Sequence, residues 1–205
     1  MCAYELLMKL RERWIRLHSA MAGRTLGSYG GNGRIEYPVH INAPKNLSVG
    51  RDVVICSGTM LSCVKEWAGR GNFDGRIALG DRVVVREGVQ ISAAESVTIG
   101  NDTGLGRNVL ISDHDHDYRL VDRAILENPI TAPRPVIIED GCYLGAMVRV
   151  APGVRIGRHS TIGYASVVTR DIPPYSVAVG SPARVVRRYD FEKKLWESID
   201  GKGFS

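Results

Sequence analysis

Residues 110–120, with the sequence LISDHDHDYRL, hold two of the chain's five histidines together with three aspartates. Neutral imidazole has an ordinary pKa of about 6.5, so it can accept a proton from a hydroxyl near neutral pH. A carboxylate beside the ring can fix its tautomer and stabilise the imidazolium that forms. The candidate general bases are therefore His116 and His114, and the candidate orienting carboxylates are Asp113, Asp115 and Asp117.

Two other interpretations of this stretch compete with general-base catalysis. Alternating Asp and His side chains can simply solvate an exposed loop, and both residue types can also bind zinc or iron. The remaining histidines, His18, His40 and His159, stand alone in the sequence, so a second group of ligands is missing. We therefore expect no metal site. Whether the histidines act as a general base or only solvate an exposed loop depends on the elements that position them.

The strongest pattern in the chain is an aliphatic residue that returns every six positions. From residue 138 onward the series is Ile138, Leu144, Val150, Ile156, Ile162 and Val168. Interrupted earlier copies are Val49, Ile55 and Leu61, then Leu79, Val85 and Ile91, then Ile99, Leu105 and Ile111. A six-residue period excludes an amphipathic helix and simple strand alternation. It predicts short strands joined by tight turns, three to a coil, stacked into an all-β solenoid around an aliphatic column.

Two segments break this period, residues 62–76 and residues 112–135. Excursions from a regular solenoid cost little loop entropy and tend to carry function, because the stacked coils position them rigidly. The stretch LISDHDHDYRL opens the second excursion, so we expect its histidines on a loop of a solenoid domain that spans residues 31–188.

The two ends of the chain are expected to cap the solenoid, because the terminal coils need a cover. Residues 1–30 carry Leu10, Trp14 and Leu17 at helical spacing, which predicts an N-terminal helical cap. Basic residues between them leave a membrane-surface helix as the alternative. Residues 189–205, which include DFEKKLWESI, predict a C-terminal arm with a short helical cap.

Composition narrows the class of protein. A chain of 205 residues that is 44% hydrophobic suits one globular domain. The net charge of +5 permits nucleic-acid binding, yet only 7% of residues are aromatic and no nucleic-acid-binding motif occurs, so no such partner is expected. No apolar run approaches the roughly 20 residues of a membrane-spanning helix, and the four cysteines form no CxxC pair. We expect reduced, buried thiols in a cytoplasmic protein that is peripheral at the inner membrane surface if its N-terminal helix binds lipid.

The segment IIEDGCYLGAMVRVAPGVRIGRHSTIGYASVVTRDIPPYSVAVGSPARVVRRY resembles the last coils and the exit of the hexapeptide-repeat acyltransferases. The resemblance covers roughly residues 31–188, most of the chain, and is nearest to the galactoside, maltose and polysaccharide O-acetyltransferase branch. It implies a left-handed parallel β-helix, acetyl-CoA as the acyl donor and a carbohydrate acceptor. It also implies a homotrimer with active sites between subunits.

The same resemblance assigns roles to residues. The catalytic histidine of the branch stands five positions after an aliphatic residue that matches Ile111, which points to His116, with His114 as the alternative. The implied contacts to coenzyme A are Ala146, Tyr164, Thr169, Arg170, Arg184 and Arg187. Guanidinium groups suit the nucleotide phosphates of this donor, and small residues suit its pantetheine arm.

The sequence therefore predicts an O-acetyltransferase that moves acetyl from acetyl-CoA to a hydroxyl of a sugar or polysaccharide precursor. An N-acetyltransferase acting on an amino sugar is the alternative within the same chemistry. A trimeric scaffold without catalytic activity is the alternative of another class.

Overall fold

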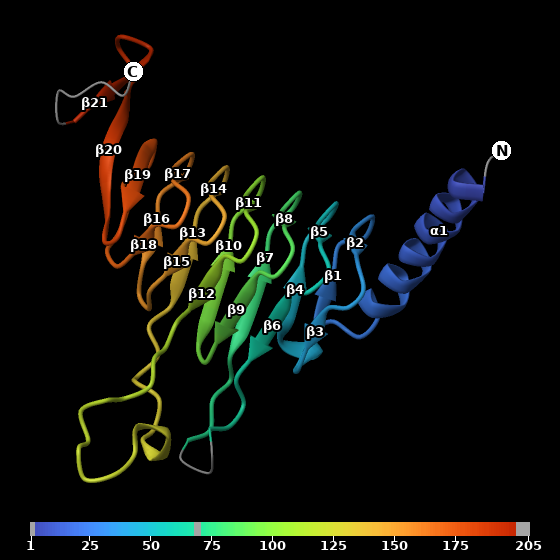
Figure 1. Ribbon diagram of the computed structural model, residues 1–205, viewed down its shortest axis with the longest axis horizontal. Helices are drawn as coiled ribbons and strands as arrows, with labels where there is room; N and C mark the ends of the chain where they lie inside the picture. Colours follow the sequence, from blue (N-terminus) through green and yellow to red (C-terminus); the bar gives the residue numbers. More distant parts are fainter. Residues whose placement is uncertain (1–2, 68–70, 200–205) are drawn as a thin grey trace.

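The computed structural model describes residues 3–67 and 71–199, and it forms a three-sided solenoid with a helix at one end and a β-hairpin at the other (Figure 1). Successive strands pass in turn to the first, second and third sheet, so one strand from each sheet makes a coil. Strands stacked from coil to coil pair in parallel, as the six-residue period predicts.

The first sheet contains β1 (Ser28–Tyr29), β4 (Leu47–Val49), β7 (Arg76–Leu79), β10 (Ser96–Ile99), β13 (Val136–Ile138) and β16 (Arg155–Ile156). The second sheet contains β2 (Arg34–Ile35), β5 (Val54–Ile55), β8 (Val84–Val85), β11 (Gly104–Leu105), β14 (Tyr143–Leu144), β17 (Thr161–Ile162), β19 (Ser176–Gly180), β20 (Ala183–Asp190) and β21 (Leu195–Ser198). The third sheet contains β3 (His40–Ile41), β6 (Met60–Cys63), β9 (Gln90–Ala93), β12 (Leu110–Ser112), β15 (Arg149–Val150) and β18 (Val167–Val168). Two short 3₁₀ helices, η1 (Pro44–Asn46) and η2 (Ile125–Glu127), lie in the connections.

The aliphatic series predicted from the sequence forms the core of the solenoid. Every member, from Val49 to Val168, is buried, and each strand from β13 to β18 ends on its member of the series. Burial of such side chains contributes about 1.5–3 kcal/mol each. The small residues beside them let the coils stack closely: a Cβ on Gly145 would lie 2.8 Å from the backbone nitrogen of Tyr164 in the next coil.

The N-terminal helix α1 (Ala3–Gly23) packs only one of its faces on the first coil. Ile15 and Ser19 are buried there, and Leu26 continues the contact after the helix ends. The far end of α1 projects away from the solenoid (Figure 1). The prediction of a helix at this end is confirmed.

The expected helical cap at the C-terminus is wrong, because β20 and β21 form an antiparallel hairpin on β19. Asp190 accepts hydrogen bonds from the backbone N–H groups of Glu192 and Lys193, and Lys194 adopts a left-handed conformation with φ 55°, which makes the turn. Without the hairpin, β19 would leave a row of unpaired backbone groups at the edge of the second sheet. Pairing of this edge explains why the segment forms strands and not the expected helix.

Both excursions leave the coils on the same side of the solenoid (Figure 1). One connects β6 to β7, and the other connects β12 to β13. Because β6 and β12 are both strands of the third sheet, the two excursions emerge from one face, two coils apart.

Candidate active site

Asp113 anchors the start of the second excursion. It follows β12 directly and is fully buried. Its carboxylate accepts the backbone N–H groups of Ala94 and Glu95, each at 2.8 Å, from the turn between β9 and β10. The ring Nδ1 of His114 lies 2.7 Å from the same carboxylate. A buried carboxylate requires such a complete set of donors, so the excursion starts from a fixed point.

The strand-like pairing of residues 115–117 with residues 129–131 shapes the next part of the loop. Thr131 donates its backbone N–H to the carbonyl of Asp115 at 2.8 Å, and Asp117 donates to the carbonyl of Pro129 at 3.1 Å. His116 faces Ile130 between these bonds. The backbone of His116 is therefore held from both sides.

Asn128 ties the loop together from inside. Its side-chain NH₂ donates to the backbone carbonyls of Asp117 at 2.6 Å and Leu120 at 3.1 Å. Its backbone carbonyl accepts the indole N–H of Trp67 at 3.2 Å. The indole belongs to the first excursion, so Asn128 joins the two loops. Its side-chain oxygen is buried and has no hydrogen-bonding partner in the described ranges 3–67 and 71–199.

A cavity of about 370 Å³ lies between the two excursions and the third sheet. His114 and His116 both line it, with Trp67 on the opposite loop. Its floor is formed by residues of the third sheet: Met60, Ser62, Gln90, Ile91, Ser92, Leu110, Ile111 and Ser112. The volume falls within the range of small-molecule sites, which run from about 300 to 1,000 Å³.

The two histidines differ in accessibility. The His114 side chain is 12% exposed, and Asp113 occupies its Nδ1, which leaves Nε2 as its remaining ring nitrogen. His116 is exposed, and its ring packs edge-on against Trp67 with centroids 4.9 Å apart. Neither ring nitrogen of His116 has a hydrogen-bonding partner in the part of the chain that the structure describes. The structure thus offers one open imidazole and one imidazole oriented by a carboxylate.

The other two aspartates of the stretch have different partners. Arg119 donates hydrogen bonds to the Asp117 carboxylate from its side chain and its backbone, and these lower the pKa of Asp117 to about 2. Asp115 is exposed, and its backbone N–H donates to the Thr131 hydroxyl. Of the three candidate orienting carboxylates, only Asp113 contacts a histidine.

Two of the predicted donor-binding residues lie together on the solenoid. Leu144 pairs with Ile162, so Ala146 and Tyr164 occupy equivalent turns of successive coils. Tyr164 is exposed, and Ala146 lines a second cavity of about 550 Å³ on the second sheet together with Tyr143.

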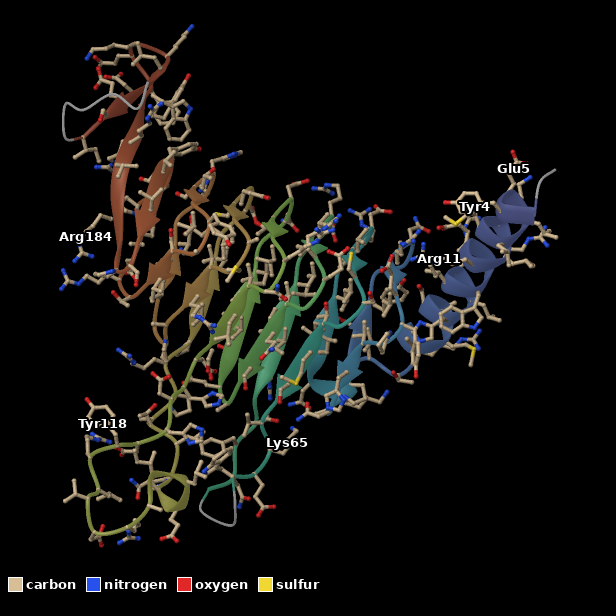
Figure 2. The ribbon with its side chains drawn as sticks, in the orientation of Figure 1. Tyr4, Glu5, Arg11, Lys65, Tyr118 and Arg184 are labelled. Atoms are coloured by element: carbon tan, nitrogen blue, oxygen red, sulfur yellow. The ribbon has the colours of Figure 1, made fainter. Side chains whose placement is uncertain are left out.

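The remaining four donor candidates lie nearer the C-terminus. Thr169 and Arg170 are exposed directly after β18. Arg184 and Arg187 lie on β20, the first exposed and the second half-buried. None of the six donor candidates lines the histidine cavity of its own chain. Figure 2 shows this separation, with Arg184 on the terminal hairpin and Tyr118 on the histidine loop.

Trp67 and Asn128 complete the site and were missed in the sequence. Both stand in segments without periodicity, and their contact joins positions 61 residues apart. A tryptophan in an excursion that interrupts a solenoid was the available signal, because a large aromatic side chain seldom lies in a loop without a partner.

No cysteine of the described residues lines the histidine cavity. Cys56, Cys63 and Cys142 are free and buried, as predicted, whereas Cys2 lies outside the described residues. Burial raises the pKa of all three thiols, that of Cys142 to about 11. The described residues contain no cluster of three or more metal-ligating side chains. No helix among them has the length and hydropathy to span a membrane.

Stacked three-strand coils with a six-residue period are the architecture of hexapeptide-repeat proteins, and comparison with known proteins agrees. The family model for the bacterial transferase hexapeptide (six repeats) matches residues 135–170. The chain is 33% identical over 175 residues to the putative lipopolysaccharide biosynthesis O-acetyl transferase WbbJ of Escherichia coli, covering 80% of this chain and 82% of that protein. It is 36% identical to the galactoside O-acetyltransferase of E. coli over 52% of this chain and 51% of that one. The chain belongs to the hexapeptide-repeat acyltransferase family.

Solved structures share the fold at low identity. The N-acyltransferase AntD from Bacillus cereus, solved with dTDP and 3-hydroxybutyryl-CoA, has a TM-score of 0.71 at 17% identity and covers 86% of this chain and 90% of its own. A hexapeptide-repeat acetyltransferase from Vibrio cholerae, solved with acetyl coenzyme A, has a TM-score of 0.52 at 22% identity, with coverages of 84% and 76%. The fold is the left-handed parallel β-helix that the sequence predicts.

Proposed function

We propose that this protein is an acetyl-CoA-dependent O-acetyltransferase acting on a hydroxyl of a sugar or polysaccharide precursor. The observation that carries the proposal is the open imidazole of His116, held by a paired loop at the wall of a small-molecule-sized cavity. The names of the E. coli relatives, which describe O-acetyl transfer in lipopolysaccharide biosynthesis and to galactosides, support the acceptor class.

The reaction we propose is direct transfer within a ternary complex. A ring nitrogen of His116 takes the proton of the acceptor hydroxyl as that oxygen attacks the thioester carbonyl. The tetrahedral intermediate collapses with cleavage of the carbon–sulfur bond, and the coenzyme A thiolate leaves and takes up the proton. The products are the acetyl ester and the free thiol. No cysteine lines the cavity, and the described thiols are buried, which favours this route over an acyl-enzyme intermediate.

We assign His114 a positioning role. Its ring is largely covered and bound to Asp113, and its backbone N–H and carbonyl both contact the Ser112 hydroxyl. These contacts fix the root of the loop two residues before His116. The same Asp113–His114 pair also has the form of a base with its orienting carboxylate, so His114 is the second candidate for the base.

In our proposal, a neighbouring subunit binds the donor, acetyl-CoA. Arginines at 184 and 187 would pair with the phosphates of acetyl-CoA, while Ala146 and Tyr164 would flank its pantetheine arm. These groups lie on other coils than the histidine cavity. In the proposed homotrimer, the late coils of one chain would lie beside the third sheet of the next. We place the reaction in the cytoplasm, where free thiols persist.

A pair of single variants tests the base. With saturating acetyl-CoA, His116→Ala is expected to lower the rate of thiol release by roughly 10²–10⁴-fold, the range for loss of a positioned proton acceptor. His114→Ala is expected to lower it less, and His159→Ala, at a remote turn, serves as the matched control. A near-normal rate in His116→Ala with a collapsed rate in His114→Ala moves the base to His114. Near-normal rates in both variants would show that residues 110–120 form a solvated loop without a catalytic histidine.

The acceptor is tested with matched pairs of sugars that carry a hydroxyl or an amine at one position. The fold shared with the N-acyltransferase AntD makes N-acetylation of an amino sugar the second candidate function. Faster thiol release with the hydroxyl sugars supports O-acetylation. Absence of turnover across both sets, with acetyl-CoA bound or unbound, would favour the trimeric scaffold.

A further inference from the structure

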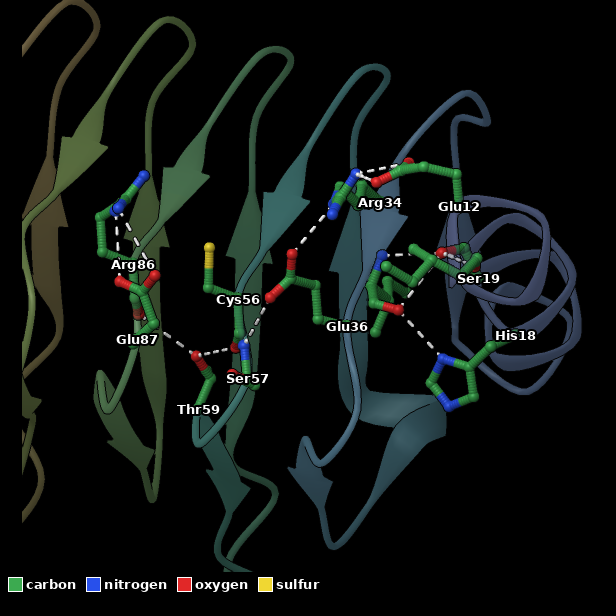
Figure 3. A network of polar contacts seen from close by, with 12 residues as sticks. Glu12, His18, Ser19, Arg34, Glu36, Cys56, Ser57, Thr59, Arg86 and Glu87 are labelled. Atoms are coloured by element: carbon green, nitrogen blue, oxygen red, sulfur yellow. Dashed lines mark hydrogen bonds and ion pairs between the residues drawn. The ribbon is translucent and has the colours of Figure 1, made fainter. Parts of the chain in front are cut away.

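The helix α1 is docked on the solenoid through directional contacts that fix which face points outward (Figure 3). The Ser19 hydroxyl accepts the backbone N–H of Ile35 at 2.8 Å and donates to the carbonyl of Ile15 at 2.7 Å. The ring Nδ1 of His18 lies 3.0 Å from the carbonyl of Ile35. The C-terminal half of α1 is therefore pinned to β2.

An ion pair extends this attachment toward the middle of the helix. The Arg34 guanidinium contacts the Glu12 carboxylate at 2.8 Å and also donates to Glu36 at 3.0 Å (Figure 3). Glu12 lies on the same face of α1 as Ile15 and Ser19, at helical spacing. Rotation of α1 about its own axis would break these contacts together.

The opposite face of α1 is apolar and exposed. It consists of Leu6, Leu7, Leu10, Trp14, Leu17 and Met21, each between 46% and 64% exposed. At about 100° per residue these side chains fall within an arc of roughly 100°. Together they form a stripe, which we call the outer stripe, along most of the helix. A continuous stripe of this kind on a protein surface marks an interaction site.

Basic residues border the outer stripe on both sides. With the same helical geometry, Arg13 and Arg16 lie along one border and Arg11 along the other, and all three are exposed. The acidic residues of the helix, Glu5 and Glu12, lie outside the stripe, and Glu12 is paired with Arg34. Figure 2 shows Arg11 near the middle of α1.

These features distinguish between two occupants. Packing of outer stripes from two copies of the chain would bring the bordering arginines of both helices together, and like charges across a helix interface oppose association. Anionic headgroups would instead neutralise them, while leucine and tryptophan side chains enter the boundary with the acyl chains. The charge pattern favours a lipid surface.

We propose that α1 is a membrane-surface helix whose outer stripe binds a bilayer containing anionic phospholipid. The solenoid then lies on the membrane through its N-terminal end. This inference does not depend on the acyltransferase reaction, and the enzyme can bind lipid whether or not His116 is its base.

Vesicle co-sedimentation of the full-length protein tests the proposal. The native protein is expected to sediment with vesicles of phosphatidylglycerol and phosphatidylethanolamine and to bind phosphatidylcholine vesicles much more weakly. Leu10→Glu/Leu17→Glu is expected to abolish binding, because it places charge in the stripe while glutamate preserves helix propensity. Arg13→Gln/Arg16→Gln is expected to weaken binding about thirtyfold, since each basic residue near an anionic surface contributes about 1 kcal/mol.

Phe191→Glu is the matched control, because Phe191 is 62% exposed on the hairpin at the other end of the solenoid. It is expected to bind vesicles as the native protein does. Failure of the native protein to sediment with the anionic vesicles overturns the proposal. So does a smaller oligomer for Leu10→Glu/Leu17→Glu in analytical ultracentrifugation, which would make the outer stripe an interface between copies of the chain.

Discussion

At the scale of single residues, Asp113 controls the histidine loop through bonds that reach outside it. Two of its partners are backbone N–H groups at the turn of the preceding coil, and the third is the His114 ring. Because the carboxylate is fully buried, loss of any one bond leaves a group without its partner. The loop and the solenoid are therefore coupled at this one side chain.

Asp113→Asn is expected to lower both stability and catalytic rate. The amide keeps the shape of the side chain, but in either orientation its NH₂ faces the backbone N–H of Ala94 or of Glu95, so one hydrogen bond is lost. We expect a cost of about 1–3 kcal/mol in the free energy of unfolding, measured by chemical denaturation. The rate of thiol release is expected to fall as the loop root shifts. Asp115→Asn is the control for stability, since Asp115 is exposed and should leave the free energy of unfolding unchanged. Equal stability of both variants would show that Asp113 is not an anchor.

The sequence predicted the residue types of the site but not their partners. Alternation of Asp and His indicated acid–base chemistry, and three aspartates remained equivalent as orienting groups. Only the fold distinguishes them, because Asp113 meets Ala94 across one coil, a separation of 19 residues, and Asp117 meets Arg119 locally. Contacts between coils have no short-range signature, and for this reason Trp67 and Asn128 were also missed.

At the scale of elements, the 112–135 excursion behaves as a folded unit, although it has little regular secondary structure. Backbone pairing holds its two arms, and Asn128 fills its interior with hydrogen bonds to Asp117 and Leu120. The indole N–H of Trp67 donates a hydrogen bond to the backbone carbonyl of Asn128 and joins this loop to the other excursion. Such a loop can hold His116 in place without a strand.

Asn128→Ala is expected to loosen this loop and leave the solenoid intact. The side chain is fully buried and supplies two hydrogen bonds, so its removal exposes two carbonyls without donors. Amide hydrogen exchange should accelerate at Asp117 and Thr131 while β13 to β18 remain protected. The rate of thiol release should fall more than the Michaelis constant for acetyl-CoA rises. Val121→Ala, at a 93% exposed position of the same loop, is the control. Unchanged exchange in Asn128→Ala would contradict this account of the loop.

Periodicity predicted the elements where neighbouring coils repeat and failed where they do not. The column from Ile138 to Val168 is regular because each coil packs on a nearly identical one. The segment DFEKKLWESI has no following coil, and the expectation of a helix there took no account of the open edge of β19. Edge pairing is a tertiary effect, so the hairpin of β20 and β21 could not be predicted from the sequence of this segment alone.

At the scale of the whole molecule, the proposed donor-binding residues lie apart from the histidine cavity, and the proposed homotrimer would bring them together. The histidine cavity lies on the third sheet beside the excursions, whereas Arg184 lies on the terminal hairpin. In a cyclic homotrimer every interface is the same, so each would join the histidine loop of one chain to the donor groups of the next. A monomer would carry both the histidine loop and the donor groups, but it could not bring them together.

Mixed trimers test this arrangement directly. The two parents are His116→Ala, which lacks the base, and Arg184→Ala/Arg187→Ala, which lacks phosphate contacts and is assayed at limiting acetyl-CoA. Each parent alone is expected to be nearly inactive. When chains with different affinity tags are co-expressed in equal amounts, a site is complete if one chain supplies His116 and its neighbour supplies both arginines. Random assembly gives each of these with probability one half, so about one quarter of all sites in the unselected mixture regain activity. Every trimer that carries both tags has one complete site among its three, so about one third of the sites in the purified mixed trimers regain activity. If one chain supplied both His116 and the arginines of a site, every site in the mixture would lack one of them. The mixture would then stay as inactive as its parents. The measurement is thiol release from purified trimers that carry both tags.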